Sequence, residues 1–128
     1  MVESINCKII RWDDIHQAIS EIAQSIKEDD FTPDYVVSIA RGGVVPARLL
    51  CDELMLKNFI SIKANHWGIT ANKDGKAVLS QKTSVDLKDK KILLVDDITD
   101  TGESMSVCTD YLKSLKPKQL KTAALYHL

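Results

Sequence analysis

The chain has 128 residues, of which 45% are hydrophobic and 27% are charged, and its formal net charge is −1. This length and composition predict one folded domain with its own core, rather than a disordered chain or two domains. A net charge so close to zero gives no electrostatic reason to expect nucleic acid or a membrane surface as the main partner.

The cysteines and the apolar runs indicate a cytoplasmic protein. The three cysteines, Cys7, Cys51 and Cys108, are far apart and show neither metal-ligand spacing nor a disulfide framework. No apolar run reaches the length of a membrane span, and the N-terminal residues lack a signal-peptide pattern. Cys108 falls on the apolar face of a predicted helix, so we expect it to be buried.

The first part of the chain predicts a helix, a buried strand and a sharp break. Apolar residues at three-and-four spacing predict a helix over Asp13–Asp29, with Asp13 as its N-cap and Trp12 just outside it. The β-branched run Tyr35–Ala40 is typical of a buried parallel strand. Arg41–Gly43 interrupts that strand.

The middle of the chain predicts a second helix and a hairpin-like pair of strands. Pro46 fits the first turn of a helix that runs to about Leu56. A strand over Phe59–Lys63, a polar loop over 65–76 and a further strand over Ala77–Val85 follow.

The last part repeats the order of strand, loop, helix and strand. The second buried strand covers Lys91–Asp96, a turn covers Ile98–Gly102, a helix covers Glu103–Leu115, and Leu120–Leu128 forms the last strand. Strands that alternate with helices predict an α/β fold, a Rossmann-like parallel sheet flanked by helices. Ligands of such sheets bind outside the carboxyl ends of the strands, so the loops after the two buried strands are the candidate site.

The second of these loops combines groups that bind phosphate with groups that repel it. Free amides at a helix start favour an anion, and a glycine permits close backbone approach. The carboxylates must then face hydroxyl donors or a metal. A phosphorylated ribose satisfies both, with its phosphate on the amides and its hydroxyls on Asp96 and Asp97. The residues concerned are Asp96, Asp97, Asp100, Thr101, Gly102, Glu103 and Ser104.

The first loop carries a guanidinium and exposed amides at the same edge. Arg41 suits recognition of a phosphate or pyrophosphate, although by itself a solvated arginine on a glycine-rich turn explains the pattern equally well. Beside the second loop, a second anion site is the better interpretation. A signalling receiver domain also ends a strand in an acidic pair, but on its first strand, whereas Asp96 and Asp97 come late in this chain.

These motifs resemble those of the type I phosphoribosyltransferases, and most closely the small purine enzymes that act on xanthine, guanine or hypoxanthine. Val95–Ser104 matches the family's phosphoribosyl pyrophosphate motif, and Ile39–Ala47 is similar to its pyrophosphate loop and the helix that follows. The resemblance covers nearly the whole chain, as a single domain over residues 1–128.

The resemblance implies a magnesium-dependent transfer of phosphoribose from phosphoribosyl pyrophosphate to a purine base, by a homodimer. Asp96 and Asp97 would hold the ribose hydroxyls and Mg²⁺, directly or through ligand or water, and Asp100–Ser104 would hold the 5′-phosphate. Arg41 and Gly42 would bind pyrophosphate, and Asp100 would be the general acid or base. The loop over 65–76 falls where the family has a mobile lid, for which His66 and Trp67 are candidates.

The C-terminal part departs from the resemblance. Family members continue past the strand that ends near Tyr126 into a further strand and a hood that holds the base. Their base-contacting lysine is not evident, and His127 or Leu128 stands in its place. The hood is apparently absent here, so a sensor that binds phosphoribosyl pyrophosphate or a nucleotide without turnover is the alternative to the enzyme.

Overall fold

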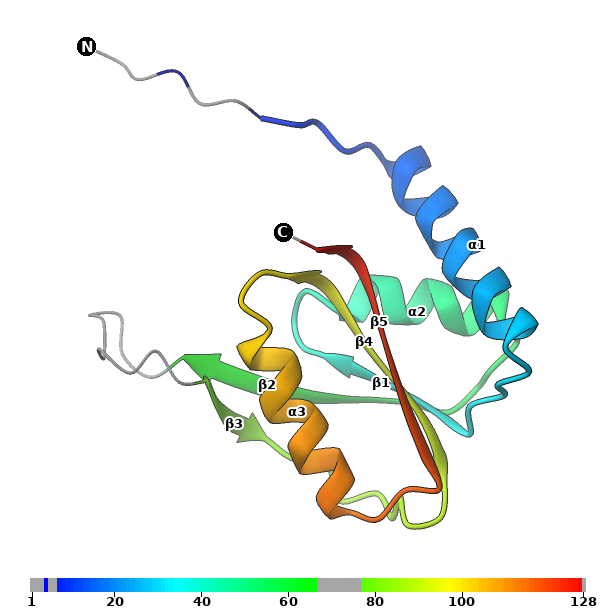
Figure 1. Cartoon of the computed structure of the whole chain (residues 1–128), viewed down its shortest axis with the longest axis vertical. Coiled ribbons are helices and arrows are strands. Elements are labelled where there is room, and N and C mark those ends of the chain that lie inside the picture. Colours follow the sequence, from blue (N-terminus) through cyan, green and yellow to red (C-terminus); the bar gives the residue numbers. More distant parts are fainter. Residues whose placement is uncertain (1–3, 5–6, 67–76, 128) are drawn as a thin grey trace.

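In the computed structural model, which describes residues 4, 7–66 and 77–127, a five-stranded sheet is flanked by three helices (Figure 1). The helices are α1 (Trp12–Glu28), α2 (Val44–Glu53) and α3 (Glu103–Ser114). The strands are β1 (Tyr35–Ile39), β2 (Phe59–His66), β3 (Ala77–Gln81), β4 (Lys91–Thr99) and β5 (Gln119–His127). The predicted α/β fold is confirmed. Within the described part of the chain, no helix is long and apolar enough to cross a bilayer.

The strand order β3-β2-β1-β4-β5 places the two most buried strands side by side. β1 pairs in parallel with β2 and β4, and β4 pairs in parallel with β5, whereas β3 is antiparallel to β2. The connection from β1 leads through α2 to one side, and that from β4 leads through α3 to the other. The carboxyl ends of β1 and β4 therefore form the switch point at which ligands bind in such sheets.

Both faces of the central strands are covered, which explains their continuous apolar sequences. Val36, Leu93 and Val95 pack in one core with the buried residues of α1 and α2. Their neighbours in sequence face the opposite way and form a second core with α3, because side chains alternate along a strand. This second core contains Val37, Ile39, Ile62, Leu87, Ile92, Leu94, Cys108 and Leu112. Cys108 is buried, as predicted.

Several predicted boundaries are wrong, among them the end of α2, which lies at Glu53 and not near Leu56. The N-cap of α1 is Arg11, not Asp13, because the Arg11 carbonyl accepts the first helical hydrogen bond, from the Ile15 N–H at 3.1 Å. The Arg11 N–H donates to Asp14 Oδ2 at 2.8 Å, and Trp12 is the first helical residue. The predicted turn over Ile98–Gly102 begins too early, because pairing with β5 continues β4 to Thr99. β3 ends at Gln81 rather than at Val85.

The predicted loop over 65–76 also begins too early. Asn65 and His66 belong to β2 and pair with Val78 and Ala77. The rest of the predicted lid, residues 67–76 with Trp67 among them, lies outside the described residues.

Candidate functional site

The loops after β1 and β4 meet at the carboxyl edge of the sheet (Figure 1). The peptide bond between Ala40 and Arg41 is cis. Gly43 lies so close to β4 that an added Cβ would stand 2.4 Å from the Val95 carbonyl oxygen. At Gly42, an added Cβ would stand 2.4 Å from Asp97 Oδ2. The two loops predicted to bind the ligand are thus in direct contact, and the absence of side chains at the two glycines permits it.

The two adjacent carboxylates lie on opposite faces of β4. Asp96 is only 8% exposed, and its Oδ1 accepts a hydrogen bond from the Asp97 N–H at 2.9 Å. Asp97 is half-buried against Gly42, and its Oδ1 accepts a bond from the Ile98 N–H at 2.7 Å. The two side chains would therefore reach one ligand from different sides, since neighbours on a strand point apart.

Burial makes the Asp96 carboxyl a weaker acid than usual. Loss of solvation raises the pKa of this carboxyl from 3.8 to about 6. The next effect in size, the hydrogen bond from the Asp97 backbone N–H, lowers this pKa, and the neighbouring Asp97 carboxyl raises it again. The Asp96 charge also contributes to the raised pKa, about 11, of the Cys108 thiol, whose main cause is burial. Near neutral pH, Asp96 is a carboxylate that is poorly solvated by the protein, and a hydroxyl donor or a cation would stabilise it.

A pocket of about 470 Å³ opens beside Asp96 at the start of α3. Gly102 has a φ of +82°, a conformation that glycine adopts readily and that turns the chain into the helix. The first turn of a helix directs N–H groups and the positive end of the helix dipole outward. The pocket is lined by Asp96, Ile98, Thr99, Asp100, Thr101, Gly102, Glu103, Ser104 and Met105.

The pocket holds side chains that are available for a ligand. Among the described residues, the Asp100 carboxylate and the Ser104 hydroxyl have no hydrogen-bond or ion-pair partner, and neither has the exposed Arg41 guanidinium on the first loop. The Thr101 hydroxyl accepts a long bond, 3.4 Å, from the Glu103 N–H. All the predicted residues of the second loop, from Asp100 to Ser104, therefore line one pocket with Asp96, while Asp97 lies toward the first loop.

One contact of this site was not predicted from the sequence. Thr99 Oγ1 lies 2.7 Å from His127 Nδ1, which joins the end of β4 to the end of β5. The signal is the parallel register, which pairs Thr99 with His127, and a register between distant segments cannot be read from either segment alone.

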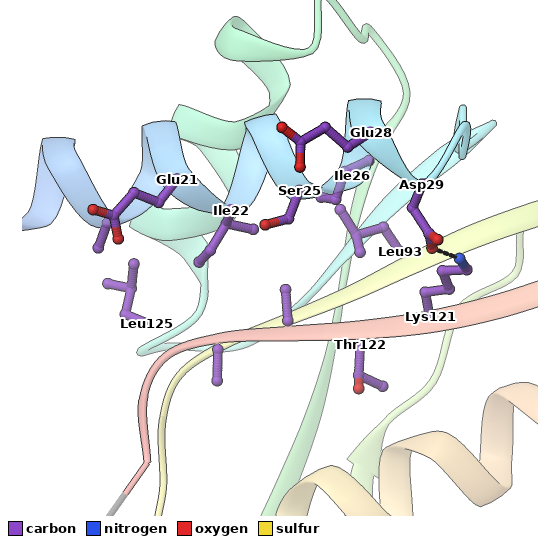
Figure 2. A pocket seen from close by; sticks show the side chains of 13 residues that line it. Glu21, Ile22, Ser25, Ile26, Glu28, Asp29, Leu93, Lys121, Thr122 and Leu125 are labelled. Atoms are coloured by element: carbon purple, nitrogen blue, oxygen red, sulfur yellow. Dashed lines mark hydrogen bonds and ion pairs between the residues drawn. The ribbon is translucent and has the colours of Figure 1, made fainter.

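A larger hollow, of about 810 Å³, lies elsewhere, between α1 and β5 (Figure 2). Its floor is apolar, with Ile22 and Ile26 of α1 facing β5, and its rim carries Glu21, Glu28 and an ion pair between Asp29 and Lys121. The residues come from regular helix and strand, and the hollow lies along the sheet edge rather than at the carboxyl ends. We name it the α1–β5 groove.

Known proteins share both the sequence pattern and the fold. Residues 11–127 match the model of the family "Phosphoribosyl transferase domain". A hypoxanthine-guanine phosphoribosyltransferase of Aquifex aeolicus is 30% identical over 120 residues, which are 89% of this chain and 66% of the relative. A xanthine-guanine phosphoribosyltransferase of Desulfotalea psychrophila is 32% identical over 111 residues, which are 85% of this chain and 63% of the relative. The chain thus spans less than two thirds of either relative.

The structural comparison agrees with the sequence comparison. A purine phosphoribosyltransferase from Pyrococcus horikoshii superposes with a TM-score of 0.77 at 29% identity, over 93% of this chain and 84% of the other. The range matched by the family model, residues 11–127, contains the sheet, the flanking helices and both loops of the candidate site. By its sequence, its fold and the geometry at the ends of β1 and β4, this chain belongs to the phosphoribosyltransferase family.

Proposed function

We propose that the protein transfers phosphoribose from phosphoribosyl pyrophosphate to a purine base, either guanine, xanthine or hypoxanthine, with Mg²⁺. The observation that carries this proposal is the juxtaposition at one sheet edge of a pocket lined by Asp96 and Asp100–Ser104 and a loop that carries Arg41 and Gly42. Such a site can hold the two ends of one ligand, a 5′-phosphate and a pyrophosphate, with a ribose between them.

The pocket accounts for the sugar-phosphate half of the substrate. The 5′-phosphate would accept bonds from the first-turn amides of α3 and from the Thr101 and Ser104 hydroxyls. Ribose hydroxyls would donate to Asp96 and Asp97. Each hydrogen bond to a charged group contributes about 1.5–3 kcal/mol, so a few of them would hold the ligand firmly.

The carboxylates also fit the proposed ion. Mg²⁺ prefers oxygen ligands and is often held by one or two carboxylates together with substrate oxygens. Among the described residues, no three potential metal ligands cluster, so Asp96 and Asp97 would hold the ion jointly with the substrate rather than in a cage of their own. When bound, Mg²⁺ would neutralise the charge that develops on the departing pyrophosphate.

In the proposed reaction, a ring nitrogen of the base bonds to the anomeric carbon of the ribose as the bond from that carbon to pyrophosphate breaks. Pyrophosphate leaves with the electron pair, and the Arg41 guanidinium stabilises its charge. The ring N–H proton of the base passes to Asp100, whose carboxylate has no partner among the described residues. Asp96 and Asp97, by binding the hydroxyls, orient the ribose for attack.

A titration followed by a product assay tests this proposal. The chain is titrated with phosphoribosyl pyrophosphate and Mg²⁺ by calorimetry, and guanine, xanthine, hypoxanthine or adenine is then added and nucleotide is measured by chromatography. Binding followed by nucleotide formation supports the transferase and identifies the base. An Asp100→Asn variant serves as the control that any product arises at this site.

The alternative is a sensor that binds phosphoribosyl pyrophosphate or a nucleotide without turnover. It is favoured by the departure at the end of β5, where His127 or Leu128 stands in place of the base-contacting lysine that the family resemblance implies. Tight binding with no nucleotide from any of the four bases would select the sensor. No binding at all would contradict both functions.

A further inference from the structure

The pocket lined by Asp96 and Ile98–Met105 is named the phosphate pocket here. The loop at its centre makes few hydrogen bonds of its own. Residues 100–102 lie between the end of β4 and the start of α3, outside regular structure. In the described part of the chain, their hydrogen bonds reach only near neighbours in sequence, from the Ser106 N–H to the Gly102 carbonyl at 2.8 Å and from the Glu103 N–H to Thr101 Oγ1 at 3.4 Å. A segment held by so few contacts opens at little cost.

Immediately before this loop, a side-chain bond ties β4 to β5. Thr99 and His127 form the last residue pair in the parallel register of these strands. Thr99 Oγ1 and His127 Nδ1 are 2.7 Å apart, and Thr99 also lines the phosphate pocket. The bond therefore fixes the residue to which Asp100 is directly attached, at the carboxyl end where the backbone leaves the sheet.

We propose that His127 is a positioning residue, which holds Thr99 and thereby keeps Asp100–Ser104 in the conformation that receives the 5′-phosphate. This inference rests on the proposed function for the identity of its ligand. If the bond is absent, the end of β4 is free to separate from β5, and the loop must be ordered when the phosphate binds, at a cost in affinity. His127 itself need not touch the substrate.

Variants of both partners test the inference. His127→Ala and Thr99→Val each remove the bond, and Thr99→Val does so with little change in shape. We expect each to weaken binding of phosphoribosyl pyrophosphate by about 3- to 10-fold, the range of one ordinary hydrogen bond. The double variant is expected to be no weaker than the single variants, because the two changes remove the same interaction. Inorganic pyrophosphate, which would bind at the Arg41 loop, is expected to keep its affinity.

A conservative variant and a matched histidine provide the controls. His127→Asn places an amide close to the position of Nδ1 and is expected to restore most of the affinity, whereas a merely space-filling role would not be rescued by it. His16→Ala removes an exposed imidazole from α1, on another part of the molecule, and is expected to change nothing. Urea denaturation of each variant verifies that the fold is retained.

Hydrogen exchange of the ligand-free protein separates this inference from the proposed function. In His127→Ala and Thr99→Val, the hydrogen-bonded amides of Glu103 and Ser106, which donate to Thr101 Oγ1 and to the Gly102 carbonyl, are expected to exchange about 3- to 10-fold faster than in the wild type, and in His127→Asn they are not. If exchange and affinity are both unchanged in His127→Ala, the inference is overturned and the proposed function stands. If the wild type does not bind phosphoribosyl pyrophosphate, the proposed function fails, and unchanged exchange in His127→Ala would then still overturn the positioning role.

Discussion

The pocket at the start of α3 and the α1–β5 groove are both open hollows, but different kinds of structural element line them. The pocket, of about 470 Å³, is lined by a strand end, a loop and a helix start, whereas the groove, of about 810 Å³, is lined by the sides of a helix and a strand. The middle of a helix satisfies its own backbone groups, so α1 presents only side chains to the groove, whereas the start of α3 also presents backbone N–H groups to the pocket.

The chemistry of the lining residues, rather than the volume, therefore distinguishes the candidate site from the α1–β5 groove. In the pocket, the buried Asp96 carboxyl and the Asp100 carboxylate, which has no partner among the residues that the structure describes, lie beside hydroxyls and helix amides. In the groove, the lysine of the rim already has an acidic partner and lies 5.0 Å from the centroid of the Phe31 ring. Variants of the pocket should therefore change ligand binding or turnover, and variants of the groove should not.

The largest effect is expected from Asp100→Asn. The amide cannot accept the proton of the base, so turnover should fall by about 10²–10⁴-fold while most binding of phosphoribosyl pyrophosphate is retained. Steady-state rates and calorimetric affinities of the same preparations measure the two quantities. A parallel loss of affinity and no further loss of turnover would instead make Asp100 a residue that positions the substrate.

The next largest effect, a loss of affinity for phosphoribosyl pyrophosphate, is expected from the double variant Asp96→Asn and Asp97→Asn. If both carboxylates bind ribose hydroxyls, the affinity for phosphoribosyl pyrophosphate should fall by about 10- to 100-fold, because each Asn oxygen still accepts a hydrogen bond, but a neutral bond contributes about 1 kcal/mol less than a bond to a charged group. The free energy of unfolding should fall by less than the free energy of binding. Unchanged affinity would contradict the assignment of the diol.

Substitutions of the two glycines of the first loop should affect the free energy of unfolding and the affinity for phosphoribosyl pyrophosphate differently. Gly43→Ala brings a Cβ against the backbone of β4 and should lower the free energy of unfolding by about 1–3 kcal/mol. In Gly42→Ala the clash is with the Asp97 side chain, which can rotate away. We therefore expect a smaller loss of stability in Gly42→Ala but weaker binding of phosphoribosyl pyrophosphate. Urea denaturation and calorimetry measure both, and equal losses of stability in the two variants would contradict the packing described here.

Asp96 should make the ligand-free protein less stable as pH rises. Its pKa is about 6 in the folded chain and 3.8 ordinarily, so between these values the folded state binds more protons than the unfolded state. The free energy of unfolding should fall between pH 4 and pH 6, by an amount on the order of 2 kcal/mol, and level off above. Urea denaturation in the presence of a chelator, compared between wild type and Asp96→Asn, isolates this contribution. If the difference between the two proteins is independent of pH, the buried carboxyl does not titrate in this range.

The smallest effect is expected in the groove. The Lys121 and Asp29 side chains are 37% and 62% exposed, and pairs as exposed as this contribute little. Lys121→Met should lower the free energy of unfolding by less than about 1 kcal/mol, including the loss of its contact with Phe31, and leave the affinity for phosphoribosyl pyrophosphate unchanged. A marked loss of affinity would show that the groove and the pocket are coupled.

Local patterns predicted most of the elements, and the errors lie at their ends, where hydrogen bonds that the patterns do not show decide the boundary. The periodicity of α1 identified the helix, but its start depends on which carboxylate accepts the Arg11 N–H, and Asp14 rather than Asp13 does so. The end of β4 was placed too early because Asp97 and Thr99 are polar, whereas pairing with β5 carries the strand past them. Sequence preference is a weak guide where a neighbouring strand supplies the hydrogen bonds.

The α/β fold, the two buried strands and the loop of Asp96–Ser104 can be predicted from the amino-acid sequence, because apolar periodicity, glycine and helix-start chemistry all act over a few residues. The position of Gly42 against Asp97, the burial of Asp96 and the bond between His127 and Thr99 follow only from the folded structure. These facts depend on strand order and register, which are fixed by contacts between segments far apart in the chain.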